Sequence, residues 1–390
     1  MAKKRGKKDP LWARLSLISG ALLLLVTGGT LVGGNLLLNH YSDQITQEGG
    51  LGDAAAAGTN IDGPINLLLV GIDERIGNEA MGARADSIIV AHVPATHDAV
   101  YMMSIPRDTR VRIPSSPKTK YPGGTDKINA AFQFGYQNGG GRAGGMELLA
   151  NTVNQMSGGL TFNGAAIVNF DGFRGLVHAL DGVHMCVDEK VTSIHVGRDK
   201  RTGEWGKTMP YNFTPDGNPT TLKPHMEPKV YEVGCRDFLP WEALDYVRQR
   251  DKLEHSDGDY GRQRHQQQFI KAMVKKATSA GVITNPIKVN EVLSSVGKAV
   301  TFYRGRVELV DWIFTLKGID PDKMVTLRTN NGQYNPEKIN GQLFESLDQT
   351  AKDLLKAFKD DTVAQFVAAH PEMIANEASA PASNPSNSGR

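Results

Sequence analysis

Residues 65–73, "INLLLVGID", form an apolar stretch of strand length that ends in an aspartate. An uninterrupted apolar run of this kind is typical of a strand buried on both faces of a sheet. Two more strands are predicted at residues 87–93, "SIIVAHV", and 99–105, "AVYMMSI", joined by the turn "PATHD". These three segments predict the start of a central sheet.

Strand and helix patterns alternate along the rest of the chain. Further strands are predicted at residues 165–171, 183–191 and 323–329, and helices at residues 126–136, 145–156, 173–182, 239–250, 262–279, 305–318 and 342–358. Residues 192–230 have weak periodicity and many glycine, proline and charged residues, so we expect an insertion loop there. The interleaving predicts an α/β fold whose helices cover both faces of the sheet.

The N-terminal region is not globular in character. Residues 1–14 carry a dense positive cluster, whereas residues 15–38 carry no charge. An apolar run of roughly 24 residues can cross a bilayer core as a helix, and the basic flank favours a cytoplasmic N-terminus. A cleaved signal peptide is the alternative, but its apolar region would span only about 7–15 residues.

This reading divides the chain into five parts. We predict a cytoplasmic basic tail (1–14), a transmembrane anchor (15–38), a linker (39–63), one extracytoplasmic domain (64–372) and a disordered tail (373–390). Cys186 and Cys235 would then lie in an oxidising environment. We predict a disulfide between them, and two unpaired buried thiols are the alternative.

The overall composition excludes some functions. Of the 390 residues 40% are hydrophobic and 22% are charged, and the formal net charge is +2. This balance is ordinary for a globular domain. Because no domain-wide basic face is implied, nucleic acid is not an expected partner.

The connections between the first three strands predict which strand ends meet. The short turn at residues 94–98 favours an antiparallel pair, and so does the loop of about a dozen residues after Asp73, which has no obvious helix. The end of the first strand, the start of the second and the end of the third then share one sheet edge. That edge would collect Asp73, Arg75, Arg84, Asp86, Arg107 and Asp108.

Carboxylates and arginines gathered at one sheet edge suit a metal-bound phosphate. Mg²⁺ takes one or two carboxylates and completes its shell with phosphate and water. Arginine holds phosphate oxygens through a planar fork that stays charged. The alternative is that the aspartates only neutralise the neighbouring arginines in structural ion pairs.

Six short motifs follow one another in a characteristic order. They are "GID" (71–73), "RADS" (84–87), "SIPRDTRV" (104–111), "DKINAAF" (126–132), "ALDYVRQR" (243–250) and "DGDYGRQRHQQQ" (257–268). Each motif alone is weak, but the ordered set resembles the LytR-CpsA-Psr family over about residues 65–280. The resemblance implies an αβα sandwich around a central mixed sheet, with an apolar tunnel for a lipid and a pyrophosphate at the tunnel mouth.

The resemblance also implies an activity. Family members move a glycopolymer from a polyprenyl-pyrophosphate carrier onto peptidoglycan, form a phosphodiester and release polyprenyl phosphate. Mg²⁺ is the expected cofactor, with Asp73 and Asp86 as its ligands. The residues expected to contact the pyrophosphate are Arg84, Arg107, Lys127, Arg248, Arg250, Arg262 and Gln266. Asp86, Arg84, Arg107 and Asp108 form the expected catalytic group.

Two details of the motifs qualify this assignment. Asp259 has the family's place before Arg262 and is expected to orient it. His265 stands where many relatives have arginine, which leaves open whether Arg264 replaces that charge. Neither Asp86 nor Asp108 is identified as a general base.

Three other functions are weighed against the transferase. A pyrophosphatase would use the same site with water as the acceptor. A binding module for anionic cell-wall polymer would keep the arginines but need no Mg²⁺. A regulator that binds DNA is disfavoured, because only about a dozen residues would lie in the cytoplasm beside the DNA.

Overall fold

The computed structural model describes residues 46–47, 49–57, 61–74, 82–215, 217–282, 299–303 and 319–375, together with positions 288, 292, 305 and 307. The predicted anchor at residues 15–38 and Arg75 lie outside the described residues, as does most of the helix predicted at residues 305–318. Within the described ranges, no helix combines the length and apolar character needed to span a bilayer.

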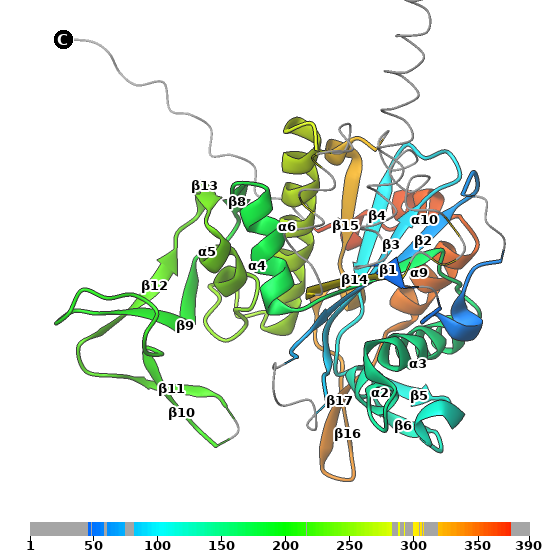
Figure 1. The fold of residues 1–390 in the computed structure, drawn as a ribbon, viewed down its shortest axis with the longest axis horizontal. Helices are drawn as coiled ribbons and strands as arrows, with labels where there is room; N and C mark the ends of the chain where they lie inside the picture. Colours follow the sequence, from blue (N-terminus) through cyan, green and yellow to red (C-terminus); the bar gives the residue numbers. More distant parts are fainter. Residues whose placement is uncertain are drawn as a thin grey trace, which may run out of the picture.

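A seven-stranded mixed sheet forms the centre of the fold (Figure 1). Its strands, in spatial order, are β1 (Thr46–Gln47), β14 (Val300–Tyr303), β7 (Gly164–Val168), β2 (Ile65–Ile72), β3 (Ala85–Val93), β4 (Val100–Ser104) and β15 (Met324–Leu327). β2 pairs antiparallel with β3, and β3 pairs antiparallel with β4, as predicted. β7 and β15 join parallel to β2 and β4, which makes the sheet mixed.

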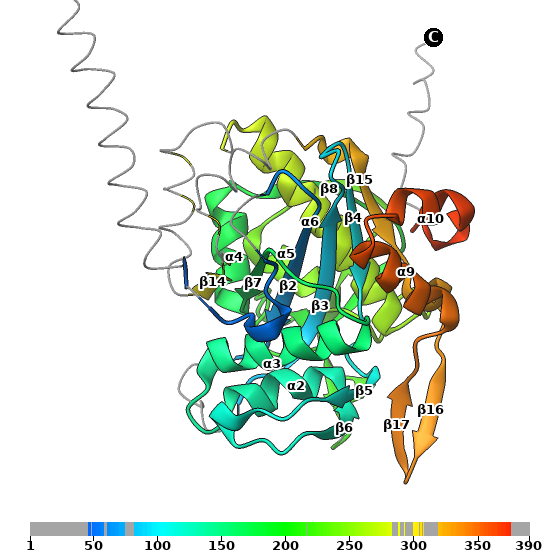
Figure 2. The same ribbon diagram turned by 90° about the vertical axis from the view of Figure 1, so that its right-hand side faces the viewer.

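Helices cover both faces of this sheet, so the predicted three-layer α/β architecture is confirmed (Figures 1 and 2). One face carries α2 (Ile128–Tyr136), α3 (Gly141–Met156), α9 (Gln349–Lys359) and α10 (Val363–Ala369). On the other face lie α4 (Phe170–Ala179) and α6 (Asp259–Ser279), and α5 (Pro240–Tyr246) packs against α4. Pro240 begins α5, as its fixed φ favours at a first helical position.

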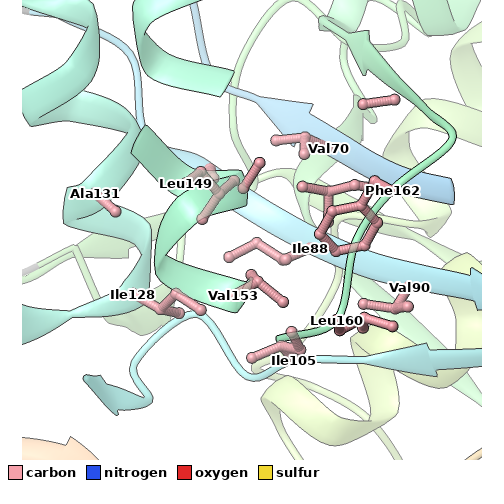
Figure 3. Packing of buried hydrophobic residues seen from close by; sticks show 14 of the residues in the cluster. Val70, Ile88, Val90, Ile105, Ile128, Ala131, Leu149, Val153, Leu160 and Phe162 are labelled. Carbon is pink, nitrogen blue, oxygen red and sulfur yellow. The ribbon is translucent and has the colours of Figure 1, made fainter. Parts of the chain in front are cut away.

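The alternation of β3 determines which layer each side chain joins. Ile88 and Val90 point into the core shared with α2 and α3 (Figure 3), whereas Ile89 and Ala91 contact the cluster that includes Ile270 of α6. β3 is therefore buried on both sides, as its apolar sequence predicts.

The helices α2 and α3 approach each other closely through small residues. A Cβ added to Gly135 would lie 2.2 Å from the carbonyl oxygen of Gly144. The backbones can therefore pack at this distance only where both positions lack a side chain.

The predicted insertion loop at residues 192–230 is wrong, because this region forms two-stranded sheets. β9 (Val191–Asp199) pairs with β12 (Met226–Tyr231), and β10 (Tyr211–Phe213) pairs with β11 (Pro219–Leu222). The strand β11 is almost wholly exposed and buries little apolar surface, so it lacks the periodic pattern that sequence reading detects. Together with β8 and β13, described next, these strands form a small lobe.

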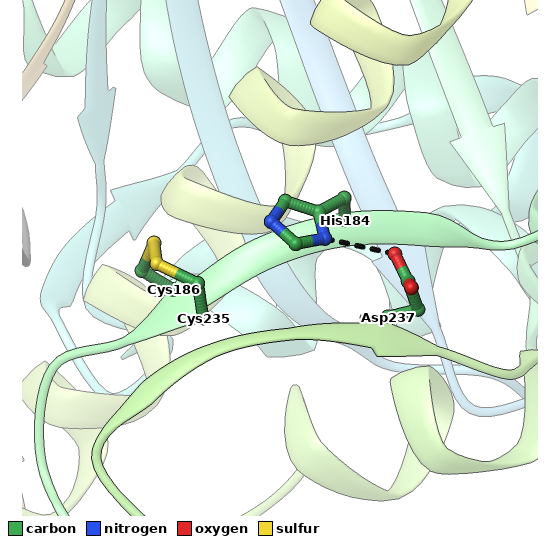
Figure 4. The surroundings of a disulfide bond; sticks show 4 residues. All are labelled: His184, Cys186, Cys235 and Asp237. Atoms are coloured by element: carbon green, nitrogen blue, oxygen red, sulfur yellow. Dashed lines mark hydrogen bonds and ion pairs between the residues drawn. A yellow bond between two sulfur atoms is a disulfide. The ribbon is translucent and has the colours of Figure 1, made fainter. Parts of the chain in front are cut away.

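The lobe contains the predicted disulfide. β8 (Val183–Val187) pairs antiparallel with β13 (Gly234–Phe238), and Cys186 lies directly opposite Cys235 in the register. The two sulfurs are bonded (Figure 4). Two positions further along the register, His184 Nδ1 lies 2.8 Å from Asp237 Oδ1. The bond therefore crosslinks two adjacent strands of the lobe.

The remaining strands form two small hairpins. β5 (Arg110–Ile113) pairs with β6 (Gly124–Lys127), which leads directly into α2. β16 (Pro336–Ile339) pairs with β17 (Gln342–Glu345). The single helix predicted at residues 342–358 is therefore partly wrong, because β17 occupies its first four residues. The helix α9 begins only after Asp348, whose side chain accepts a hydrogen bond from Ala351 N at 2.7 Å and caps it.

Both predicted ends of the domain need correction. Leu51 and Ala54, in the predicted linker, are buried in the core, and Ala54 N donates to Asn151 Oδ1 at 3.0 Å. At the other end, Met373 is buried and Ala375 N donates to Thr326 O at 2.9 Å. Packed structure therefore starts before residue 64 and continues past residue 372.

Candidate functional site

A cavity of about 650 Å³ lies between the sheet and the helices α4, α5 and α6. Four residues along one face of α6 show that the cavity has a charged end and an apolar end. Arg262 and Gln266 line one end, and Ile270 and Met273, further along the helix, line the other. Eleven residues of helix span about 16 Å, so the lining changes from charged to apolar over that length.

The residues on the other walls of the cavity also form an apolar part and a charged part. The apolar part of the lining includes Leu69, Ile89, Val168, Phe173, Leu176, Leu244, Ile270 and Met273. The charged part includes Asp73, Asp86, Arg107, Arg248, Arg250, Asp251 and Arg262. A ligand with a long apolar chain and an anionic group at one end matches this arrangement.

The charged end is built where three strands terminate. Asp73 follows β2, Asp86 lies at the start of β3, and Arg107 comes shortly after β4. All three line the cavity, so the structure brings together residues that sequence separates by up to 34 positions. The convergence predicted from strand pairing is thus present.

Arg107 is the centre of an ion-pair network. Its Nη1 donates to Asp86 Oδ1 at 2.7 Å, and its Nε lies 3.9 Å from carboxylate oxygens of both Asp108 and Asp259. Lys127 Nζ lies 2.8 Å from Asp108 Oδ1 and extends the network outward. Burial alone would lower the pKa of Arg107, but the surrounding carboxylates, Asp86 foremost, outweigh it and raise the pKa. The guanidinium is therefore held charged.

Arg262 reaches the same point from α6. Its Nη2 lies 2.6 Å from Asp259 Oδ1 and donates to Asp86 O at 2.8 Å, so Asp259 contacts it as predicted. Burial lowers the pKa of Arg262 from its usual value, although Asp259 opposes the effect. Within the described structure, the Nε atoms of Arg262 and Arg107 are buried without a hydrogen-bond partner. Unsatisfied buried donors of this kind favour an anionic ligand at this end.

Three further predicted residues complete the charged end. The guanidinium of Arg248 stacks 4.2 Å above the ring of Phe170, a cation–π contact that fixes its plane. Arg250 Nε lies 3.6 Å from Asp251 Oδ2. Gln266 accepts from Ser87 Oγ at 2.8 Å and donates to Val247 O at 3.2 Å. All of them line the cavity.

Three predicted site residues do not line the cavity. Arg84 is exposed, and its Nε donates to Gln133 Oε1 on α2 at 2.8 Å. Asp108 and Lys127 pair with each other and reach the cavity only through Arg107. The structure therefore does not place Arg84 where it would contact a ligand in the cavity.

His265 and Arg264 belong to a separate buried cluster. His265 Nε2 lies 3.2 Å from Asp188 Oδ1 and 3.3 Å from Glu189 Oε1, and its side chain is fully buried. Arg264 forms ion pairs with the same two acids and with Asp257. Neither side chain lines the cavity, so Arg264 does not add a charge to the candidate site.

Sequence reasoning missed His195 and the buried polar groups behind it. His195 lies on β9, inside the region predicted to be a loop, and it lines the charged end. Asp245 and Gln249 belong to the "ALDYVRQR" motif, but the sequence alone predicts no role for them. Ser193 Oγ and Gln249 Nε2 each lie 2.8 Å from Asp245 Oδ1. Only the position of β9 against α5 reveals this group.

Asp73 and Asp86 are the residues suited to a divalent cation. Both line the charged end, where two carboxylates stand beside arginines that fit phosphate. Hard carboxylate oxygens, few in number and next to a phosphate site, form the donor set that Mg²⁺ prefers. The residues present therefore fit the predicted metal.

Comparison with known proteins gives a consistent picture. A model of the LytR_cpsA_psr family matches residues 38–360. The polyisoprenyl-teichoic acid–peptidoglycan teichoic acid transferase TagU of Oceanobacillus iheyensis is 31% identical over 266 residues, which are 68% of this chain and 62% of that protein. The chain thus spans somewhat less than two thirds of that relative.

Solved structures share the fold. The crystal structure of Bacillus subtilis TagV has a TM-score of 0.53 at 21% identity, covering 78% of this chain and 99% of that one. A structure of TagT bound to LIIa-WTA has a TM-score of 0.52 at 20% identity, covering 79% of this chain and 95% of that one. With the family match over most of its length, the chain belongs to the LytR_cpsA_psr family.

Proposed function

We propose that the protein is a Mg²⁺-dependent phosphotransferase that moves a glycopolymer from a polyprenyl-pyrophosphate carrier onto peptidoglycan. One observation carries the proposal: the lining of one cavity is mostly apolar and also contains converging arginines and aspartates. The Oceanobacillus relative, named as a teichoic acid transferase acting on peptidoglycan, supports the same class of reaction.

The apolar part of the cavity suits the lipid chain. Phe173 and Leu176 of α4, Leu244 of α5 and Met273 of α6 offer a lining without charge. Burying polyprenyl carbons there is favourable by about 25 cal/mol for each Å² removed from water. Because the pyrophosphate is bonded to one end of the polyprenyl chain, it then lies at the charged end of the cavity.

The charged end suits the pyrophosphate. Arg107, Arg248, Arg250 and Arg262 supply four guanidinium groups, and a bidentate fork matches phosphate oxygens. Asp73 and Asp86 would hold Mg²⁺, which neutralises phosphate charge when bound. Asp259 and Phe170 position two of the arginines before any ligand arrives.

The transfer itself needs little covalent help from the protein. A hydroxyl oxygen of the acceptor bonds to the phosphorus next to the glycan, the bond from that phosphorus to polyprenyl phosphate breaks, and the hydroxyl proton leaves to solvent. The products are a phosphodiester and polyprenyl phosphate. Catalysis then consists of positioning and of charge stabilisation by the fixed arginines.

The location follows from the same proposal. A peptidoglycan acceptor places the domain outside the cytoplasm, with the predicted anchor at residues 15–38 holding it at the membrane. The bond between Cys186 and Cys235 supports an oxidising compartment.

The test uses the full-length chain in detergent with a polyprenyl-pyrophosphate-linked glycan, Mg²⁺ and a soluble peptidoglycan fragment. We expect release of polyprenyl phosphate together with glycan attached to the fragment. Arg248→Ala should abolish this, whereas Arg174→Ala, which removes an exposed arginine of α4, should not. Release of polyprenyl phosphate without any attachment would favour a pyrophosphatase, and binding without release would favour a polymer-binding module.

A further inference from the structure

His195 lines the charged end of the cavity but has no place in the scheme above. Its side chain is 24% exposed. Burial, together with the charges of Arg248 and Arg250, lowers its pKa. Nδ1 faces the protein interior, where Gln249 Nε2 lies 3.0 Å away. Among the residues that the structure describes, none is hydrogen-bonded to Nε2.

The orientation of the Gln249 amide is fixed by its surroundings. Gln249 is fully buried, and its Oε1 accepts from the backbone N of Ile194 at 3.0 Å. Its Nε2 lies 2.8 Å from both the carbonyl oxygen and Oδ1 of Asp245. A flipped amide would set oxygen against two oxygens and NH₂ against an N–H group, so only the observed orientation points the N–H groups toward acceptors.

That orientation decides the tautomer of His195. An amide NH₂ group is a donor, and a protonated Nδ1 facing it would place two donors against each other. Nδ1 therefore carries no proton. Asp245 Oδ1 lies 3.8 Å from Nδ1, too far for a hydrogen bond that would favour the other tautomer. The proton of the neutral ring must be on Nε2.

The ring is also held neutral. Burial, and then the charges of Arg248 and Arg250, lower the pKa of His195 to about 4. The carboxyl of Asp245 does not offset this effect, because its oxygens bond to Ser193, Tyr231 and Gln249 and its Oδ1 lies 3.8 Å from Nδ1. At neutral pH the ring presents an uncharged N–H from Nε2.

We propose that His195 binds substrate through Nε2–H, donating to an oxygen of the phosphate held by Arg248 and Arg250, and that Gln249 is the positioning residue that fixes this tautomer. The inference rests on the proposed function, because it assigns a contact within that site. A neutral donor adds direction to phosphate binding where two arginines already supply the charge.

The tautomer is measurable directly by NMR. Full-length chain in detergent, labelled with ¹⁵N-histidine, would be studied by long-range ¹H–¹⁵N correlation, with His195→Gln to assign the signal. We expect a neutral ring with the proton on Nε2 from pH 8 down to about pH 5. Gln249→Leu should remove the preference between the two nitrogens. An Nδ1–H ring or an imidazolium at pH 7 in the wild type would overturn the inference.

Binding tests the contact with phosphate. Using farnesyl pyrophosphate with Mg²⁺ as the probe, we expect His195→Phe to raise the Kd by about tenfold to a hundredfold, the range for a hydrogen bond to a charged group. His195→Gln, whose amide N–H can take the place of Nε2–H, should stay within about threefold of wild type. His184→Phe, a matched change at an exposed histidine, should have no effect.

The outcomes separate the two proposals. If wild type and His195→Phe bind the probe equally well, the role of His195 is refuted while the proposed function stands. If the wild type does not bind the probe at all, both are refuted. Equal weakening by His195→Gln and His195→Phe would mean that the ring acts by shape and not as a donor.

Discussion

Arg107 Nη1 lies 2.7 Å from Asp86 Oδ1, and this ion pair joins the end of β4 to the start of β3 across the charged end of the cavity. The pair leaves Arg107 Nε buried without a hydrogen-bond partner in the described structure. Arg107 is thus held in place by Asp86, with Asp108 and Asp259 nearby, while its side chain lines the cavity where a ligand would lie.

Replacement of Arg107 should therefore affect turnover more than folding. We expect Arg107→Ala to lower kcat for glycan transfer on the order of 100-fold, by analogy with the loss of one fixed donor to a developing charge. Arg112→Ala removes an exposed arginine of the nearby strand β5 and should leave kcat unchanged. A loss of activity in Arg112→Ala of the same size would show that net charge, and not position, is responsible.

Metal removal should stop the reaction if Asp73 and Asp86 hold Mg²⁺. We expect EDTA to abolish transfer and added Mg²⁺ to restore it. Asp73→Asn should raise the Mg²⁺ concentration needed for half-maximal rate by at least about tenfold, because an amide oxygen is a weaker ligand than a carboxylate. Asp322→Asn, at an exposed carboxylate that pairs with Lys275 of α6, is the matched control. Full activity in EDTA would refute the metal assignment.

The buried cluster around His265 should make stability depend on pH. Burial alone lowers the pKa of His265, but Asp188 and Glu189 outweigh it and raise the pKa above its ordinary value near 6.5. A raised pKa means that the protonated ring stabilises the fold fully below about pH 6.5 and that this contribution is lost as the pH rises through the folded-state value.

The difference between wild type and His265→Gln isolates this contribution. We expect the variant to be less stable by about 1–3 kcal/mol at pH 6, and by a smaller amount at pH 9, measured by urea unfolding at both pH values. His184→Gln, at an exposed histidine, should show no such change with pH. A deficit that is larger at pH 9 than at pH 6 would contradict a protonated His265.

How much the sequence could predict depends on which physical signal each residue carries. Asp73, Asp86 and Arg107 were placed together correctly because loop length determines antiparallel pairing, and pairing determines which strand ends meet. Arg84 was placed with them, but it precedes β3 at a register irregularity between Gly71 and Ile72, so its direction does not follow from strand alternation.

Other features depend on contacts between distant segments. The disulfide was predicted from the expected compartment, but the direct opposition of Cys186 and Cys235 needs the register of β8 and β13. His195 was missed because the glycine, proline and charged residues of 192–230 led the whole region to be interpreted as a loop, although β9 is partly buried. The polar path from Asp245 through Gln249 to His195 joins residues 50 positions apart, and only the packing of α5 on β9 creates it.

The N-terminal boundary of the domain gives the last prediction. Leu51 is only 1% exposed, although the sequence around it reads as a polar, glycine-rich linker. We expect Leu51→Ala to lower the free energy of unfolding of the full-length chain by about 2–4 kcal/mol, the usual cost of removing a buried leucine side chain. Asp53→Ala, two residues away and exposed, should change it by less than about 0.5 kcal/mol. Equal stability of the two variants in urea unfolding would mean that the segment is detachable. The predicted deficit would instead mean that any soluble fragment must begin before residue 51, because a later start removes part of the core between β2 and α3.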